Sequence, residues 1–324
     1  MSRCQSLQAR IDDYLAERRR QGFHLRSRAT FLSSFARFVE SKRHRGPLTA
    51  ELMAEWVRAG KDGHGDAGTW ARSWGRLRHF IRYLQQFEPH TEVPEASLFG
   101  PEPGRVAPHI YREDEIVDLL AAARALGPSG SLRPFTFETL FGLMASTGLR
   151  VSEAIHLRDA EVDLKRGMLT IRQTKFAKSR QLPIHPSTVK ALWRYRKQRE
   201  RHVPTTADMP FLIGSRGCRL GLPLGERQAH RVFIGLRNGL DWINRGGHQA
   251  PRLHDLRHTF AVRRLMRWYA DGADVDQKML ALSTYMGHAE IFYTYWYLTA
   301  VAELMAIAAG RFEQFADLAG DDDA

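Results

Sequence analysis

Apolar side chains recur at three- and four-residue spacing through the first part of the chain, a pattern that predicts amphipathic helices. Such a pattern runs over residues 8–41 and changes register after Gly22. A Gly-Pro pair then interrupts it, and Thr49 is suited to cap a second helix. A glycine-rich loop from Gly60 to Gly68 precedes a third periodic stretch, formed by Trp70, Trp74, Leu77, Phe80, Ile81 and Leu84. The pattern predicts an all-helical unit over residues 1–95.

The next stretch of the chain loses this periodicity. Residues 88–109 contain several prolines and few regularly spaced apolar side chains, which is typical of a linker. We place the linker itself at residues 96–109. The sequence therefore predicts two domains, over residues 1–95 and 110–324, a common division for a chain of 324 residues.

The second predicted domain is also mainly helical but contains a β-hairpin. It opens with an acidic helix at residues 112–126 and a buried helix at residues 134–146. Two short β-rich segments follow, residues 168–172 and 180–184, on either side of a basic turn. Helical spacing then dominates and ends in an amphipathic tail over residues 301–318. The predicted fold class is mainly α, with a small antiparallel β-sheet in the second domain.

The composition is that of a globular protein with an excess of positive charge. The formal net charge is +12, and 40 of the 48 cationic side chains are arginines. Guanidinium groups bind phosphate oxygens in pairs, so this excess favours a nucleic-acid partner, although a GC-rich genome also enriches arginine. Two cysteines cannot build a disulfide framework or a cysteine-rich zinc site. The sequence has no apolar run that could span a membrane and no secretory leader, so we expect a cytoplasmic protein.

Two segments of the second domain contain cations suited to phosphate chemistry. The stretch Thr147–Glu153 places Arg150 after a glycine turn at the head of a helix, where an arginine and helix-end amides together can bind an anion. The hairpin tip, residues 174–180, contains lysines that could reach a phosphate or protonate a leaving oxygen. Taken alone, the first segment favours an ordinary helix cap with a surface arginine. The second segment alone does not decide between catalysis and a solvated turn.

Two further segments add histidines and tyrosines. Within His254–His258, His254 and Arg257 share a helix face, so together they could hold one phosphoryl group and move a proton. Residues 285–298 gather tyrosines around Trp296, and a phenol near cations can act as a covalent nucleophile. Structural histidines and packed aromatic rings are the ordinary alternatives. The sequence lacks acidic groups spaced for two-metal chemistry, a Walker loop and an HExxH motif, so we expect neither a metal nor another cofactor.

The order and spacing of these four segments resemble the tyrosine recombinase (phage integrase) family. That family has an arginine in a T-G-L-R-x-x-E segment, a hairpin lysine, an H-x-x-R pair, a G-H motif and a tyrosine nine residues after that last histidine. The matching positions here are Arg150, Lys175, His254, Arg257, His288 and Tyr297. Lys178 competes with Lys175 at the hairpin tip, and Tyr293 and Tyr295 lie near Tyr297. The stretch from residue 294 is more similar to integrases of mobile elements than to chromosome-dimer resolvases.

The resemblance implies a helical, SAM-like core-binding domain followed by a mostly α catalytic domain with a small antiparallel β-sheet. It also implies a site-specific recombinase that cuts and rejoins DNA through a 3′-phosphotyrosine without a cofactor. Tyr297 would attack the phosphodiester, while Arg150 and Arg257 would hold its non-bridging oxygens. Lys175 would protonate the leaving 5′ oxygen.

The remaining matches would have supporting roles. His254 would assist proton transfer at the nucleophile, His288 would hydrogen-bond the phosphate, and Glu153 would orient Arg150. The implied partners are double-stranded DNA, further copies of the chain in a homotetramer on two DNA sites, and accessory recombination proteins. The two domains would clamp the duplex, and candidate phosphate contacts are Arg18, Arg19, Arg20, Arg26 and Arg28, or Arg72, Arg76, Arg78 and Arg82. Taken one at a time, each of these arginines favours a solvated helix face.

Two other functions are open at this point. A type IB topoisomerase-like enzyme would use the same kinds of residue to relax supercoils. A DNA-binding regulator with an unused site would need no phenol among its cations, so the complete set of motifs argues against it. The C-terminal tail could dock on a neighbouring protomer or pack on its own domain.

Overall fold

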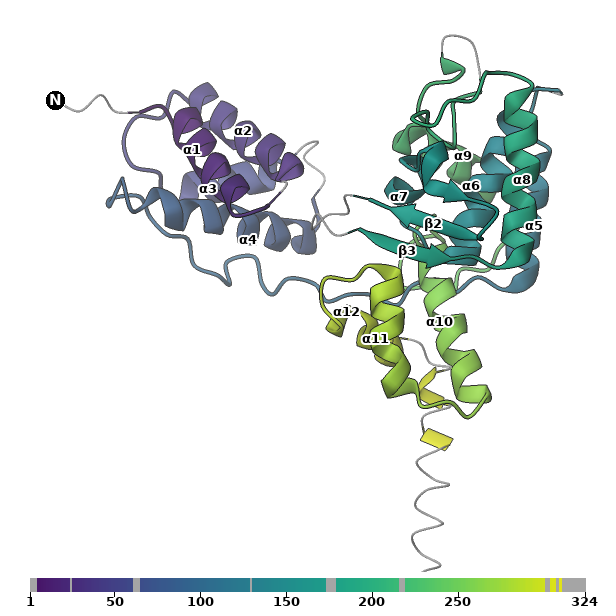
Figure 1. Cartoon of the computed structure of the whole chain (residues 1–324). Coiled ribbons are helices and arrows are strands. Elements are labelled where there is room, and N and C mark those ends of the chain that lie inside the picture. Colours follow the sequence, from purple (N-terminus) through teal and green to yellow (C-terminus); the bar gives the residue numbers. More distant parts are fainter. Residues whose placement is uncertain are drawn as a thin grey trace, which may run out of the picture. The chain divides into compact units, whose positions relative to one another are not determined.

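The computed structural model describes most of the chain (Figure 1). The described residues are 5–23, 25–60, 65–128, 130–172, 179–215, 219–300, 304–306 and 309–310. The chain divides into two compact units, residues 1–105 and 106–324. Part of the stretch that the sequence analysis assigns to the linker thus belongs to the first unit, and the domain limits at residues 95 and 110 stay a prediction.

The described part of the first unit contains four helices. Their bounds are α1 Leu7–Arg20, α2 Arg26–Ser41, α3 Ala50–Ala59 and α4 Ala67–Leu84. Gly22, with a left-handed φ of 89°, separates α1 from α2 within the single pattern seen in the sequence. Side-chain oxygens of Ser6, Thr49 and Asp66 accept backbone N–H groups at the starts of α1, α3 and α4. The predicted cap at Thr49 is therefore confirmed.

The core of the first unit is largely aromatic. Tyr14, Phe35, Trp74 and Phe80 are each at most 1% exposed. The indole N–H of Trp74 donates to the carbonyl of Glu95 at 2.6 Å. This bond, together with the ring of Phe99 centred 5.2 Å from that of Trp74, holds the segment that follows α4 against the helix.

The second unit is mainly helical and includes a small sheet. Its elements are α5 Glu113–Arg124, α6 Arg133–Thr147, α7 Val151–Ile155, the 3-10 helix η1 Asp159–Glu161, β1 Val162–Asp163, β2 Met168–Ile171, β3 Arg180–Pro183, α8 Pro186–Glu200, α9 Glu226–Arg237, α10 Asp255–Ala270, α11 Val275–Met286 and α12 Phe292–Ala300. Helix α6 lies at the centre, packed against α5, α8 and α10. The predicted class, mainly α with a small antiparallel sheet, is confirmed. No helix within the described ranges is long and apolar enough to cross a membrane.

The sheet has the strand order β1–β2–β3, and both pairs are antiparallel. In the β2–β3 pair, Leu169 lies opposite Leu182 and Ile171 lies opposite Arg180. The three apolar residues are at most 2% exposed, so one face of the hairpin belongs to the domain core. This register fixes Arg180 at the end of β3 nearest the hairpin tip. Strand β1, which is two residues long, is too short to give a periodic signal in the sequence.

The last three helices have an apolar cluster of their own. Helices α10, α11 and α12 pack on one another, and their cluster includes Met279, Tyr297 and Leu304, each at most 2% exposed. Leu304 comes from a short helical piece that follows α12. Apart from a few positions, the tail predicted over residues 301–318 lies outside the described residues.

The packing of α6 gives a direct test of the core. Phe141 is fully buried, with the ring of Phe233 on α9 centred 6.0 Å away. Replacing Phe141 by alanine removes this packing and leaves a cavity, so we expect the second unit to lose about 3–5 kcal/mol of unfolding free energy. Urea unfolding followed by circular dichroism measures the loss. The control Val117→Ala, at a position that is 59% exposed, should change it by less than about 0.5 kcal/mol.

Candidate active site

A buried carboxylate, that of Glu153, lies at the centre of the predicted site. Arg150 directly precedes α7, and Glu153 lies in the first turn of that helix. The Glu153 carboxylate accepts the backbone N–H of Arg150 at 3.0 Å and its guanidinium at 2.9 Å. Arg180 donates to both carboxylate oxygens at 3.0 Å each, and Nη1 of Arg257 lies 4.0 Å from Oε2. One carboxylate therefore organises arginines from α7, β3 and α10.

The environment of Glu153 keeps it ionised. The side chain is only 6% exposed, and burial alone would raise its pKa. Hydrogen bonds and positive charge from Arg180, together with those from Arg150, outweigh burial, so the pKa of Glu153 lies below its ordinary value. Because Glu153 accepts both the amide and the guanidinium of Arg150, it fixes the position of this arginine at the start of α7.

Arg257 is held by the ends of two helices. It donates to the carbonyl of Gly148 at 2.6 Å and to that of Met286 at 2.7 Å. Arg150 likewise donates to the carbonyl of Gly287 at 3.1 Å. Gly148 ends α6 and Gly287 ends α11, and both adopt left-handed φ values near 65°. Carbonyls at helix C-termini carry partial negative charge, so they orient and stabilise these two guanidinium groups.

Arg257 keeps its charge despite its burial. Burial, with a contribution from the positive charge of Arg150, lowers the pKa of Arg257 to about 10. That value still leaves the guanidinium protonated at neutral pH. The pair Arg150 and Arg257 therefore provides two fixed positive charges next to each other, which is what a bound phosphate requires.

The predicted histidines lie at the start of α10 and just after α11. His254 forms the N-cap position of α10, one helical turn before His258, and the two rings are 4.9 Å apart. Desolvation of the ring by the surrounding protein, followed by the positive charge of Arg257, lowers the pKa of His254 to about 4. Part of the side chain stays exposed. His288, just after α11, places Nδ1 2.7 Å from Oγ1 of Thr294. His254 is therefore neutral at neutral pH and available as a proton acceptor.

The tyrosines of α12 differ sharply in exposure. Tyr297 is 2% exposed, and its Oη lies 3.1 Å from Nδ1 of His258. The ring of His288 stacks on it at a centroid distance of 6.2 Å. Tyr293, one turn earlier, is 37% exposed. Of the candidate tyrosines, Tyr297 is the one whose hydroxyl lies against the histidines of α10.

The structure thus brings together most of the predicted site. Arg150, Glu153 and Arg257 share hydrogen bonds or close ion pairs, and His288 and Tyr297 stack on one another. Lys175 and its competitor Lys178 belong to residues 173–178, which lie outside the described residues.

Two basic surfaces lie elsewhere in the molecule. In the first unit, burial and the charges of Arg28, Arg82, Arg18 and Arg78 lower the pKa of His79, so these four arginines from α1, α2 and α4 are close to one another. Each of them is among the candidate phosphate contacts of the sequence analysis.

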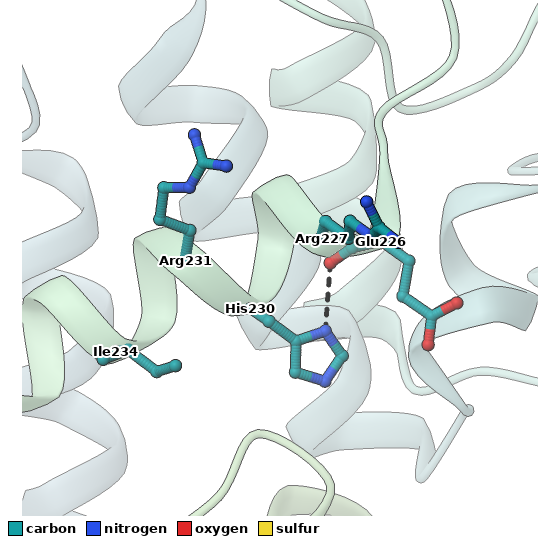
Figure 2. Close-up of a pocket in the computed structure, with 5 residues that line it drawn as sticks. All are labelled: Glu226, Arg227, His230, Arg231 and Ile234. Atoms are coloured by element: carbon teal, nitrogen blue, oxygen red, sulfur yellow. Dashed lines mark hydrogen bonds between the residues drawn. The ribbon is translucent and has the colours of Figure 1, made fainter. Parts of the chain in front are cut away.

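The second basic surface is a hollow on α9. It is lined by Glu226, Arg227, His230, Arg231 and Ile234, with the His230 ring donating to the Glu226 carbonyl at 3.0 Å (Figure 2). The opposite face of α9, with Ala229 and Phe233, is buried. No ion pair to Arg227 or Arg231 is present within the described ranges, so this helix offers two arginines to the outside.

Comparison with known proteins decides the family. The model of the phage integrase family matches residues 110–303. The protein y4rB of Sinorhizobium fredii (strain NBRC 101917 / NGR234), which is named as an integrase/recombinase, is 38% identical over 307 residues, covering 94% of this chain and 96% of that protein. The chain belongs to the phage integrase family.

Other relatives agree in sequence or in fold. The tyrosine recombinase XerC of Rhodospirillum centenum is 30% identical over 292 residues, covering 86% of this chain and 78% of that protein. The Tn1549 transposon integrase, solved with transposon right end DNA, has a similar fold, with a TM-score of 0.65 at 17% identity over 96% of this chain and all of that chain. The protein is thus a tyrosine-type site-specific recombinase, an enzyme that breaks and rejoins DNA strands.

Two residues of this recombinase site were missed by sequence reasoning. Arg180 was included there only as the last residue of the hairpin tip, yet it binds both oxygens of Glu153. His258 belongs to the quoted segment His254–His258 but received no role, yet it contacts the hydroxyl of Tyr297. The sequence contained a signal for each residue. Arg180 lies beside the predicted hairpin turn, and the four-residue spacing of His254 and His258 places them on one face of a helix.

We expect removal of the Glu153 charge to lower the stability of the protein strongly. In Glu153→Gln, Arg180 and Arg257 lose their charge partner while buried, so we expect the recombinase to lose about 3–5 kcal/mol of unfolding free energy at neutral pH. The folded pKa of Glu153 lies below the unfolded value of about 4.3, so its contribution is complete above that pH and is lost as the pH falls through the folded pKa.

Urea unfolding at several pH values measures this effect. The difference between wild type and Glu153→Gln should be largest at neutral pH and shrink on acidification below about pH 4. Glu113→Gln, at an exposed position of α5, is the control and should have a small effect. A difference that stays constant with pH would contradict the role of the ionised carboxylate.

Proposed function

We propose that Tyr297 is the nucleophile of this recombinase and that the residues around it act on one phosphodiester of double-stranded DNA. The phenolic oxygen of Tyr297 attacks the phosphorus, and the bond from phosphorus to the 5′ oxygen breaks. The products are a 3′-phosphotyrosyl link and a free 5′-hydroxyl. Attack by a 5′-hydroxyl of another strand reverses the step, breaks the link to Tyr297 and completes a strand exchange.

One observation carries this proposal. The hydroxyl of Tyr297 is buried against the histidine face of α10, while Arg257 of the same helix is tied to Arg150 through Glu153. A phenol that served only for packing would not require two fixed guanidinium groups on adjacent elements. The combination supports a covalent phosphoryl-transfer site.

The two arginines have the geometry to stabilise the transition state. Arg150 and Arg257 are fixed by Glu153 and by helix-end carbonyls before any substrate binds. Negative charge on the non-bridging phosphate oxygens increases as the phenol attacks. Positive groups that are already oriented need no reorganisation at that moment, which is how such sites lower barriers.

The histidines and the hairpin lysine would transfer protons or donate hydrogen bonds during the reaction. His254, neutral at neutral pH because of its lowered pKa, would assist removal of the proton from Tyr297. His288, whose Nδ1 lies 2.7 Å from Oγ1 of Thr294, would hydrogen-bond the phosphate. Lys175 would protonate the departing 5′ oxygen. The energy of the broken bond is retained in the phosphotyrosine, so rejoining needs neither ATP nor a metal.

Double-stranded DNA is the proposed partner, bound by both units. The arginines near His79 in the first unit and the exposed arginines of α9 in the second supply the positive charge for phosphate binding. The relatives include the λ integrase dimer bound to a COC′ core site, similar in fold with a TM-score of 0.59 at 17% identity over 90% of this chain and 76% of that chain. By analogy, four protomers on two sites, with accessory proteins, would carry out one exchange.

The nucleophile has a matched control on the same helix. Tyr297→Phe removes only the attacking oxygen, so we expect no covalent protein–DNA adduct while DNA affinity is retained. Tyr293→Phe removes a more exposed hydroxyl one turn away and should form the adduct normally. The substrates are nicked duplexes from the ends of the protein's own genetic element. A detergent-resistant adduct assay measures adduct formation in both variants, and mass spectrometry identifies the modified tyrosine. An adduct in Tyr297→Phe would refute the assignment.

The same assay separates the recombinase from its alternatives. A type IB topoisomerase-like enzyme would form the adduct but relax supercoils without joining strands of two sites. Products that join strands from two separate duplexes therefore support recombination. A protein that binds DNA but forms no adduct across a broad library of sites would be the DNA-binding regulator.

The α9 surface gives a prediction about binding. In the double variant Arg227→Ala and Arg231→Ala, we expect weaker DNA binding and a shallower dependence of log affinity on log salt, by about one unit for each phosphate that is no longer bound. The control Arg166→Ala with Arg267→Ala removes the same charge from exposed arginines that each lie beside an aspartate. Fluorescence anisotropy over a salt series measures both. Equal effects of the two pairs would contradict a specific role for α9.

A further inference from the structure

A histidine outside the predicted set, His258, contacts the hydroxyl of the proposed nucleophile. Its Nδ1 lies 3.1 Å from Oη of Tyr297, within hydrogen-bond distance. The rings of His258 and Tyr297 are 5.5 Å apart. Trp296 packs on the same imidazole at 5.6 Å, and His254 at 4.9 Å. The imidazole is therefore held between α10 and α12 by ring contacts on several sides, with one nitrogen directed at the phenol.

The surroundings of His258 determine its chemical state. Burial, with positive charge from neighbouring residues, lowers the pKa of His258 to about 2, so the ring is neutral under all ordinary conditions. A neutral imidazole has one donor and one acceptor nitrogen. In the tautomer that carries its proton on the other ring nitrogen, Nδ1 is the acceptor and the Tyr297 O–H donates to it. Because this imidazole is so difficult to protonate, it accepts a hydrogen bond from the phenol without taking up its proton.

We propose that His258 is a positioning residue of the recombinase, which accepts the hydrogen bond of the Tyr297 hydroxyl and so holds the nucleophile in the orientation for attack. This inference rests on the proposed function, because it assumes that Tyr297 is the nucleophile. It adds a residue that acts through the phenol, whereas the roles proposed for Arg150 and Arg257 are on the phosphate.

The stacking of His288 on Tyr297 gives a different restraint from the contact with His258. His288 meets Tyr297 through stacked rings, with Nδ1 directed at Thr294 instead. Stacking fixes the plane of the Tyr297 ring but leaves the hydroxyl proton free to rotate. A hydrogen bond to Nδ1 fixes the direction of the O–H and leaves the other lone pair of the oxygen pointing elsewhere. A misplaced nucleophile can cost about a hundredfold in rate.

Three substitutions separate the acceptor from the shape of the ring. His258→Phe keeps an aromatic ring but has no acceptor. His258→Asn keeps a side-chain oxygen near the position of Nδ1, whereas His258→Gln places its amide near the other ring nitrogen. We expect adduct formation on Tyr297 to slow by roughly 10- to 100-fold in the Phe and Gln variants. The Asn variant should restore the rate to within a few-fold of wild type, and all three should bind DNA as wild type does.

A substrate with a sulfur in place of the bridging 5′ oxygen locates the defect. A thiolate leaves without needing a proton, so this substrate rescues a defect in protonating the leaving group. The slow rate of His258→Phe should persist on it, because the proposed role is at the nucleophile. Rescue by the sulfur substrate, wild-type rates in His258→Phe, or equal slowing in the Asn and Phe variants would each overturn the proposal.

A spectroscopic readout tests the hydrogen bond without any reaction. In protein with ¹³C at Cζ of tyrosine, the Tyr297 signal is identified by its absence in Tyr297→Phe. It should shift in His258→Phe and stay near its wild-type position in His258→Asn; an unchanged signal in His258→Phe would overturn the proposal. If wild type forms no adduct on Tyr297 while this signal shifts as expected, the nucleophile assignment fails and the hydrogen bond to His258 stands.

Discussion

The site depends on a single buried negative charge. The Glu153 carboxylate binds guanidinium groups from Arg150 and Arg180 and lies 4.0 Å from that of Arg257. Without it, positive groups collected to bind a phosphate would repel one another in a place with little water. The carboxylate therefore makes it possible to keep arginines concentrated before DNA arrives. It also ties α7, β3 and α10 together, so the electrostatic arrangement and the packing of the domain have the same anchor.

Backbone geometry at two helix ends is part of the same arrangement. At Gly148, a side chain would meet the ring of Phe260 at 2.6 Å, and at Gly287 it would meet the guanidinium of Arg180 at 2.5 Å. Both glycines also have left-handed φ values that other residues adopt only with strain. Each therefore allows a close approach that brings a helix-end carbonyl within reach of Arg257 or Arg150. The two arginines are oriented by backbone as well as by Glu153.

Local sequence patterns predicted most of the helices and the catalytic candidates, since both depend on spacing along the chain. Arg150 with Glu153 is a pair within one turn, and His254 with Arg257 is another. The roles of Arg180 and His258 depend instead on partners 27 and 39 residues away, and spacing carries no information about such contacts. The change of apolar register after Gly22 was noted without dividing the stretch into two helices, and the strand β1 was missed because of its length.

The sequence also did not show which side chains of the site are charged at neutral pH, because this depends on burial and on neighbouring charges in the folded structure. His254 and His258 both have pKa values far below the ordinary range, so at neutral pH neither of them adds positive charge near the phenol. Arginine does not titrate in the range where cells operate. The charge that Arg150 and Arg257 supply is therefore insensitive to moderate changes of pH, and His254 and His258 are available for hydrogen bonding.

The separate apolar cluster of α10, α11 and α12 has a consequence for the order in which the protein is made. The ribosome delivers Arg150, Glu153 and Arg180 well before Tyr297, which arrives with α12 and is buried in that cluster. The main core, built around α6, can form while α12 is still absent. A nascent chain that ends before α12 would then present cations to DNA without the proposed nucleophile, so the proposed capacity to cut DNA would appear only after α12 has been made.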